Sequence, residues 1–167
     1  HSGFDLVRNE FGGWRVLEDN VRNPSGAGYA LAIRELMDDV MPDLPRPPGL
    51  LDPLAALPSL RRTLRHGFEA LGTNDPDAVV ALFSAGPSSS AWYEHQLLAE
   101  RGDLLLVTAD DLEVTGGQVR HRGSGVRIAT LYLRLDVELV DVLDSAGRRV
   151  GAEVLAVAEQ GGVYVGN

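Results

Sequence analysis

The sequence contains no cysteine and no lysine. Without cysteine, the 167 residues can hold no disulfide, no thiolate metal site and no thiol nucleophile. All 15 basic residues are arginine, so these residues supply no P-loop lysine, no Schiff-base lysine and no ammonium contact to a nucleotide. A chain without cysteine is compatible with the cytoplasm, which is where we expect this protein to act.

The sequence also lacks a long apolar run and an excess of positive charge. No apolar stretch approaches the ~20 residues that a membrane-spanning helix needs, so we expect no membrane partner. The net charge is −9, whereas nucleic-acid binding needs a basic surface, so we expect no nucleic-acid partner. Hydrophobic residues make up 44% of the chain, which is enough for one compact domain or two small domains sharing a core.

The first part of the chain changes from a strand pattern to a helical pattern. The expected elements are strands at 3–9 and 14–20 and helices at 27–41 and 52–72. Gly12-Gly13 between the two strands predicts a hairpin turn. Pro42 ends the first helix, and the proline-rich stretch 42–50 is typical of a linker.

A different pattern begins at Asp77. The segment AVVALFS (78–84) is a continuous apolar run, as in a buried parallel strand. The elements expected after it are a helix at 89–101, a strand at 103–109, a hairpin around Gly116-Gly117, a strand at 127–135, a helix at 150–159 and a closing strand in VYVGN. Strands that alternate with helices predict an α/β fold with a small, open, Rossmann-like sheet.

These patterns divide the chain into three segments. Residues 1–41 are a hairpin and helix that look like the edge of something larger, 42–76 are a proline-rich linker and a helix, and 77–167 are the Rossmann-like sheet. If residues 3–20 normally join a larger sheet, their exposed strand edge should promote a homodimer.

The hairpin gathers oxygen-bearing side chains at one end. A turn between Phe11 and Gly12 pairs residues whose numbers sum to 23. The pairs are Asp5 with Glu18, Val7 with Val16, and Asn9 with Trp14. Asn20 lies two residues beyond Glu18 and shares its face, so Asp5, Glu18 and Asn20 should converge.

Two opposed carboxylates repel each other, so a cation is expected beside them. Carboxylate and amide oxygens are the ligands that Mg²⁺ prefers, which makes Asp5, Glu18 and Asn20 a candidate metal site. The alternative is a solvated acidic end of the hairpin with Arg8 or Arg22 as its counterion.

Three segments together resemble a known family. "FDLVRNEFGGWRVLEDNVRNPSG" is similar to the closing metal-binding segment of ATP-grasp ligases, and "GPSSSAWYEH" and "YLRLD" are similar to the circularly permuted ATP-grasp proteins related to glutathionylspermidine synthase. In that group the metal-binding half comes first, a Rossmann-like pre-ATP-grasp domain follows, and the nucleotide-gripping half comes last. Segment 1–41 would then belong to the metal-binding half, and 77–167 would be the pre-ATP-grasp domain.

The resemblance implies an ATP-dependent carboxylate–amine ligase. Asp5, Glu18 and Asn20 would ligate Mg²⁺ at the ATP phosphates, and Arg22 would face the transferring phosphoryl group or the acyl phosphate. The cofactors would be ATP and Mg²⁺, and the partners a small-molecule or peptide carboxylate and an amine. Because the nucleotide lysines would lie beyond Asn167, we expect this chain to be a piece of a ligase that needs the remainder of its polypeptide and is not active alone.

The resemblance also implies substrate contacts. Ser25 and Gly26 precede a helix and could hold an anionic oxygen through backbone N–H groups. The family reading makes Ser89 and Ser90 substrate contacts, while the alternative is an ordinary strand–helix turn with a serine cap. Arg134 and Asp136 end a strand, where they could line the ligand crevice or pair with each other.

The helix after GPSSS raises a similar choice. Trp92 and His95 fall three residues apart on one face beside Glu94. These side chains could belong to the core, or Glu94 and His95 could face a substrate.

Several positions depart from the family pattern. Gly3 stands where a basic residue is common, and Leu135 interrupts a strand that usually carries two arginines. With the missing lysines, these departures leave two other functions open: a non-catalytic binding or scaffold module derived from the family, and a stand-alone nucleotide- or sugar-binding α/β domain.

Overall fold

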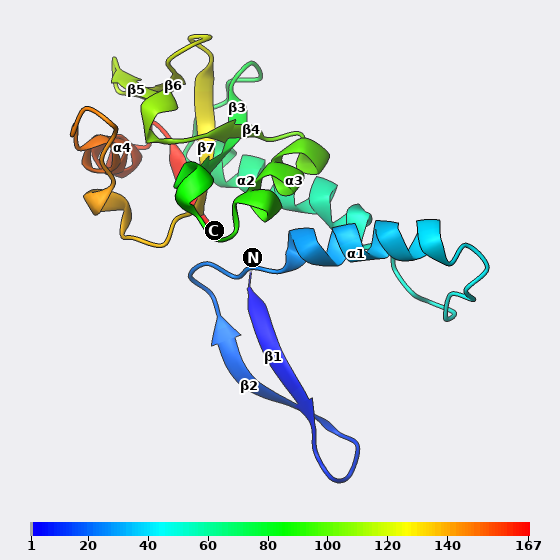
Figure 1. The fold of residues 1–167 in the computed structure, drawn as a ribbon. Helices are drawn as coiled ribbons and strands as arrows, with labels where there is room; N and C mark the ends of the chain where they lie inside the picture. The colour runs from blue at the N-terminus through cyan, green and yellow to red at the C-terminus, as the bar shows by residue number, and fades with distance from the viewer. Residues whose placement is uncertain (1) are drawn as a thin grey trace.

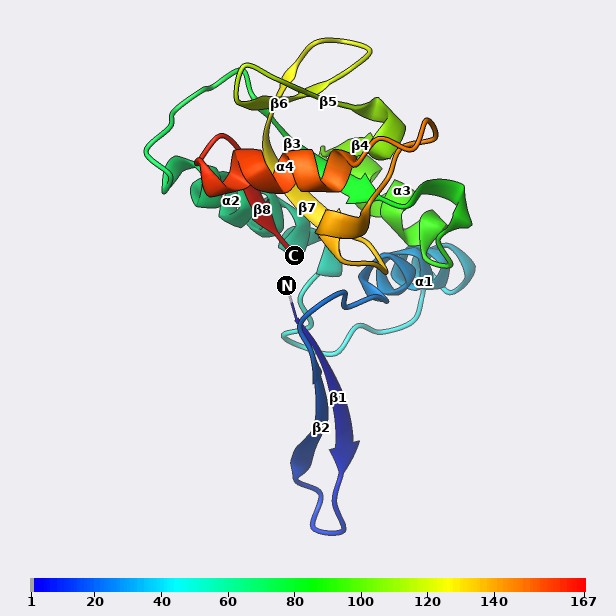
Figure 2. The same ribbon diagram turned by 90° about the vertical axis from the view of Figure 1, so that its left-hand side faces the viewer.

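A computed structural model describes residues 2–167 as an α/β body from which one β-hairpin projects (Figure 1). The hairpin consists of β1 (Gly3–Arg8) and β2 (Trp14–Asn20), and within the described residues each of these strands pairs only with the other. Both views show the hairpin standing away from the helices and the sheet (Figure 2). Its side chains are almost all exposed. The mixed α/β fold expected from the sequence is confirmed.

The hairpin contains a β-bulge that the sequence did not indicate. Asp5 pairs with Glu18 as predicted, but the register then shifts between Asp5 and Leu6. The observed pairs beyond the shift are Leu6 with Val16, Val7 with Arg15, and Arg8 with Trp14. The predicted pairs of Val7 with Val16 and Asn9 with Trp14 are therefore wrong, because the extra residue of a bulge moves the ladder by one position.

The body is built on a mixed six-stranded sheet. Its strands are β3 (Val79–Ser84), β4 (Leu105–Val107), β5 (Leu112–Thr115), β6 (Gln118–His121), β7 (Arg127–Arg134) and β8 (Tyr164–Gly166). The order is β4-β3-β7-β6-β5, and β8 also pairs with β7. The pairs β3–β4, β3–β7 and β7–β8 are parallel, whereas the predicted hairpin at Gly116-Gly117 adds the antiparallel pairs.

Helices cover both faces of this sheet. α4 (Val150–Glu159) lies on one face, while α2 (Ala56–Glu69) and α3 (Trp92–Gly102) lie on the other (Figures 1 and 2). Side chains of β3 are buried on both faces of the sheet. Ala81 and Phe83 pack against α4 on one face, and Val80 and Leu82 pack in the cluster with α2 and α3 on the other. A strand buried on both faces reads as a continuous apolar run, as this segment does.

α1 (Ala27–Val40) joins the layer on the α2–α3 side through Leu31, which is buried in the same cluster. Gly28 allows α1 to approach α3 closely, because a Cβ at this position would lie 2.7 Å from Cγ of Glu94. Thus the helix that follows the hairpin packs on the body. The segment boundaries at 41/42 and 76/77 remain a prediction.

Several elements are shorter than the sequence patterns suggested, among them α2, α3, β4 and β8. α3 begins at Trp92 rather than at residue 89, because a 3-10 turn at Gly86–Ser88 is followed by a bend and turn at residues 89–91. β4 spans Leu105–Val107 only. Among the described residues no helix has both the length and the apolar character needed to cross a membrane.

Candidate functional site

The predicted metal donors share one face of the hairpin. Asp5 lies directly opposite Glu18, and Gly3 lies opposite Asn20. Directly paired residues project to the same side of a β-ribbon, and positions two apart do so as well. Asp19 pairs with Phe4 and therefore lies on the other side. The structure thus brings Asp5, Glu18 and Asn20 together on an exposed surface.

Neither proposed arginine counterion reaches these carboxylates. The Arg8 guanidinium lies 4.7 Å from the ring centroid of Trp14, and Arg22 pairs with Glu138 at 3.0 Å. Within residues 2–167, no ion pair involves Asp5 or Glu18. Opposed like charges without a counterion destabilise a β-pair, so a bound cation would relieve this repulsion.

The donor set suits a hard cation but does not complete its coordination. Two carboxylates and one amide oxygen match the ligands of Mg²⁺, which takes six oxygen ligands in near-octahedral geometry. In the described part of the chain no group of three or more His, Cys, Asp or Glu side chains is arranged to hold a metal. An ion at Asp5, Glu18 and Asn20 therefore needs oxygens from another molecule, such as a phosphate group or water.

The base of the hairpin is tied to the end of β7. The Asn20 side chain accepts a hydrogen bond from the backbone N–H of Asn23 at 3.4 Å. The Asn23 amide in turn donates to Asp136 at 3.2 Å and to the carbonyl of Leu135 at 3.4 Å. The donor face is thereby linked to the carboxyl end of a central strand, where ligands of open α/β sheets bind.

Glu94 connects the hairpin–helix segment to the sheet. Its carboxylate accepts a hydrogen bond from the backbone N–H of Gly26 at 2.6 Å and lies 3.3 Å from Nη2 of Arg134. The Glu94 and Arg134 side chains are both fully buried. Gly26 is the N-cap of α1, with φ of 108°, so Glu94 places a negative charge at the positive end of this helix.

A second buried contact joins Ser84, at the end of β3, to His95. The Ser84 hydroxyl lies 2.7 Å from Nδ1 of His95 and accepts a hydrogen bond from the Gly86 N–H at 3.0 Å. Burial and, to a lesser degree, the positive charge of Arg134 together lower the pKa of His95 to about 4. His95 is therefore neutral at pH 7, and its buried Nε2 has no hydrogen-bond partner among residues 2–167.

Tyr132 completes this buried polar cluster. Its ring lies 5.5 Å from the Arg134 guanidinium, which stacks over it. Burial raises the pKa of the Tyr132 hydroxyl above its usual value. Tyr132, Glu94, His95 and Arg134 are all inaccessible to solvent, so they form a structural cluster beneath the surface rather than an open site. Of the two alternatives for Glu94 and His95, the structure thus shows side chains buried in the core and not side chains that face a substrate.

The predicted substrate residues fall into two groups. Gly26, Arg134 and Asp136 lie around the junction of α1 and β7. Arg134 pairs with Glu94, and Asp136 accepts a hydrogen bond from the Asn23 amide. The predicted alternative of an ion pair between Arg134 and Asp136 is therefore not what the structure shows. Ser25 is exposed beside Gly26.

Ser89 and Ser90 belong to the other group, in the turn before α3. The Ser89 hydroxyl accepts from the N–H of Ala91 at 3.3 Å, which matches an ordinary turn, while Ser90 is exposed. Their roles in binding remain predictions.

Sequence reasoning missed Asn23, Ser84 and Tyr132. Asn23 belongs to the segment VRNPSG (21–26). Its position just before Pro24, between a strand and a helix, could have indicated that its side chain binds the backbone or a neighbouring element. Ser84 closes an apolar strand, a position that faces the ligand crevice in open α/β sheets. Nothing in the local pattern marks Tyr132, because a tyrosine in an apolar strand is ordinary core.

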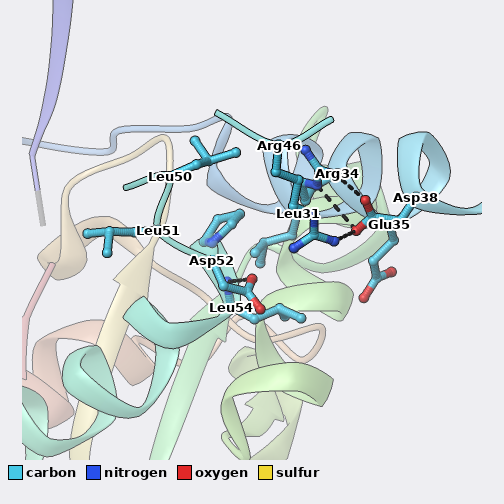
Figure 3. Close-up of a pocket in the computed structure, with 10 residues that line it drawn as sticks. Leu31, Arg34, Glu35, Asp38, Arg46, Leu50, Leu51, Asp52 and Leu54 are labelled. Atoms are coloured by element: carbon cyan, nitrogen blue, oxygen red, sulfur yellow. Dashed lines mark hydrogen bonds and ion pairs between the residues drawn. The ribbon is translucent and has the colours of Figure 1, made fainter. Parts of the chain in front are cut away.

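A small pocket lies beside α1. Its lining residues come from α1 and from the segment that precedes α2, and Asp38 pairs with both Arg34 and Arg46 (Figure 3). The pocket has a volume of about 60 Å³. Asp52, at its floor, accepts from the Leu54 N–H at 2.9 Å. A pocket of this size holds a few water molecules at most. The Asp38–Arg46 pair attaches the proline-rich segment to α1.

Comparison with known proteins establishes the class. A sequence profile of the family circularly permuted ATP-grasp type 2 matches residues 1–167, so the chain belongs to this family. The resemblance drawn from the hairpin motif is thereby confirmed.

Individual relatives agree with this class. A protein of Frankia casuarinae, which carries the provisional name glutamate–cysteine ligase 2-2, is 39% identical over 172 residues. That match covers 99% of this chain but 20% of the relative. An uncharacterized protein of Mycobacterium tuberculosis is 36% identical over 146 residues, covering 85% of this chain and 26% of that protein. The chain thus spans about a fifth to a quarter of these curated relatives.

A solved structure supports the fold. A glutathione synthetase-like effector from Globodera pallida, in its apo form, matches with a TM-score of 0.53 and covers 99% of this chain and 39% of that chain. The identity is 11%, so this likeness concerns the fold alone.

Proposed function

We propose that this chain is the metal-binding hairpin and pre-ATP-grasp segment of an ATP-dependent carboxylate–amine ligase. The observation that carries the proposal is the pairing of Asp5 with Glu18 on an exposed face, where neither carboxylate forms an ion pair with an arginine within residues 2–167. Family membership supports the ligase class. The remainder of the polypeptide would supply the nucleotide-gripping half, since this chain contains no lysine. We place the ligase in the cytoplasm.

In this reaction a carboxylate oxygen attacks the γ-phosphorus of ATP, the bond to the ADP oxygen breaks, and an acyl phosphate forms. The amine nitrogen then attacks the acyl carbon, phosphate leaves, and the nitrogen loses a proton. Asp5, Glu18 and Asn20 would hold Mg²⁺, which disperses charge on the phosphoryl oxygens when bound. Arg22 would face the transferring group, and its exposed pair with Glu138 can exchange because such pairs are weak.

The substrate roles of Ser25, Gly26, Ser89, Ser90, Arg134 and Asp136 belong to the same proposal. Gly26 and Arg134 both contact Glu94, so an anionic substrate at these donors would have to replace the Glu94 carboxylate. At Gly26 and Arg134 the arrangement therefore favours the alternative function, a non-catalytic module that kept the fold.

The test uses the full-length protein and follows Mg²⁺-dependent ADP release. Glu18→Gln should lower turnover by at least about 100-fold, because losing a metal ligand removes several kcal/mol of charge stabilisation. Asp19→Asn is the matched control, since Asp19 is a neighbouring acid on the opposite face. Unchanged turnover in Glu18→Gln, or equal losses in both variants, would contradict the proposal. Absence of ADP release from the wild type with any carboxylate and amine would favour the non-catalytic module.

A further inference from the structure

A crevice opens at the carboxyl ends of β3, β4 and β7. Its volume is 330 Å³, and its wall includes Ser84 after β3, Thr108 after β4, and Leu135 after β7. β3 lies between the other two strands, and all three run parallel. In open α/β sheets this edge is where ligands bind, and the volume suits a small organic molecule.

The charge of the crevice has one sign. Asp110 and Asp141 line it, and none of its lining residues is basic. Asp110 accepts a hydrogen bond from the Ser145 N–H at 2.7 Å, which lowers the pKa of its carboxyl and keeps it ionised. Asp141 is exposed and, within residues 2–167, takes part in no ion pair. Arg122 acts on Asp110 from outside the lining. Two carboxylates with no basic lining residue still give the crevice an excess of negative charge, which favours a positively charged ligand.

The rest of the crevice wall is largely apolar. Leu135, Val137, Val142 and Leu143 contribute to it. A cation that buries carbon on these side chains gains hydrophobic contact as well as charge pairing. A ligand that also carries a free carboxylate would place a further negative charge near Asp110 and Asp141. No basic side chain lines the crevice to form an ion pair with that carboxylate, so such a ligand should bind less tightly.

The crevice borders a second cavity, which holds the proposed phosphoryl-facing arginine. This cavity has a volume of 290 Å³ and is lined by Arg22, Glu138 and Leu139 among others. Leu135 and Val137 line both hollows, so the two share a wall. An amine held in the acidic crevice would thus lie next to the place where Arg22 meets an acyl phosphate.

We propose that the crevice bounded by Asp110, Asp141 and the residues 135–143 binds the amine substrate as its ammonium form, and that this amine has an apolar body and no free carboxylate. The assignment rests on the proposed ligase function for its biological meaning. The binding itself needs neither ATP nor Mg²⁺.

The test measures binding to the full-length protein by NMR or calorimetry without nucleotide. The probes are n-hexylamine, hexanoate and 6-aminohexanoate at pH 7. Hexylamine should bind at least about tenfold more tightly than either carboxylate, which corresponds to ~1.4 kcal/mol. Asp141→Asn should weaken hexylamine binding about tenfold, as expected for losing a charged hydrogen-bond partner. Asp39→Asn, an exposed acid on α1 outside the crevice, should leave binding unchanged.

Four results would overturn the assignment: no hexylamine binding, equal binding of hexanoate, equal binding of 6-aminohexanoate, or an unchanged affinity in Asp141→Asn. These outcomes are separate from the ligase test. If ADP release depends on Glu18 but hexylamine does not bind, only the crevice assignment fails. If hexylamine binds through Asp141 but no ADP is released with any substrate pair, the ligase proposal fails and an ammonium-binding module remains.

Discussion

The Glu94 carboxylate accepts a hydrogen bond from the backbone N–H of Gly26 at 2.6 Å, across 68 positions of sequence. The same carboxylate pairs with Arg134, 40 positions further along the chain. One buried side chain therefore holds the start of α1, and with it the hairpin, against the central strand β7. This contact, together with the Asn23–Asp136 hydrogen bond, positions the metal donors relative to the sheet.

Replacing Glu94 should destabilise the chain strongly. Glu94→Gln leaves the Arg134 guanidinium buried without a counter-charge, and breaking a buried pair in this way costs about 3–5 kcal/mol. Urea denaturation would measure the loss in the free energy of unfolding. Glu100→Gln, on the exposed side of α3, serves as control and should change this free energy by less than about 0.5 kcal/mol. A Glu94→Gln variant as stable as the control would show that the pair does not hold α1.

His95 should make the fold sensitive to mild acid. Its pKa is about 4 in the folded chain, below the ordinary value of 6.5, because burial and Arg134 disfavour the charged ring. A depressed histidine pKa means that the unfolded chain takes up the proton first. The contribution to stability is therefore complete above pH 6.5 and is lost as the pH falls toward 4, up to roughly 3 kcal/mol at about 1.4 kcal/mol per pKa unit.

The measurement is the free energy of unfolding between pH 7 and pH 4. His95→Asn keeps a polar group near the Ser84 hydroxyl but cannot titrate, so its curve should fall less steeply than that of the wild type. His66→Asn, on the exposed surface of α2, should follow the wild-type curve. Parallel curves for the wild type and His95→Asn would show that His95 is not the acid-sensitive group.

The isolated chain should bind divalent metal only weakly. Asp5, Glu18 and Asn20 supply at most part of an octahedral shell, and the phosphate oxygens of ATP would supply much of the rest. Paramagnetic broadening by Mn²⁺ should affect the amide signals around these residues at millimolar metal, and Glu18→Gln should reduce it, whereas Asp19→Asn should not. Micromolar binding of ATP by this chain alone, measured by calorimetry, would contradict the expectation.

The exposed hairpin should make the isolated chain self-associate. In the part of the chain that the structure describes, β1 and β2 pair only with each other, so both outer edges carry unpaired backbone groups. Val16 is 56% exposed beside them. Light scattering should detect dimers, and Val16→Glu should shift the population to monomers. Leu51→Glu, at a leucine 84% exposed outside the hairpin, should leave dimers in place. A wild-type chain that stays monomeric at high concentration would weaken this prediction.

Local sequence patterns predicted most of the elements but not all of the register. The Gly12-Gly13 turn and the alternation of the strands were enough to place Asp5 opposite Glu18. The bulge beyond Asp5 was not predictable, because no glycine or other bulge residue marks it. In the predicted register, Val16 would lie on the same face of the hairpin as Glu18. In the structure Val16 pairs with Leu6, which follows Asp5 and so lies on the opposite face. The bulge therefore moves Val16 to the face that carries Leu6.

The sequence by itself determined the α/β class, the hairpin with its oxygen donors, and the absence of any lysine or cysteine chemistry, because these follow from composition and short-range spacing. Only the tertiary structure decided that Glu94 occupies the N-terminus of α1, that Arg134 is buried, and that Asp110 and Asp141 line one crevice. The reason is physical: these groups are far apart in the chain, and packing of helices on both faces of the sheet is what brings them together.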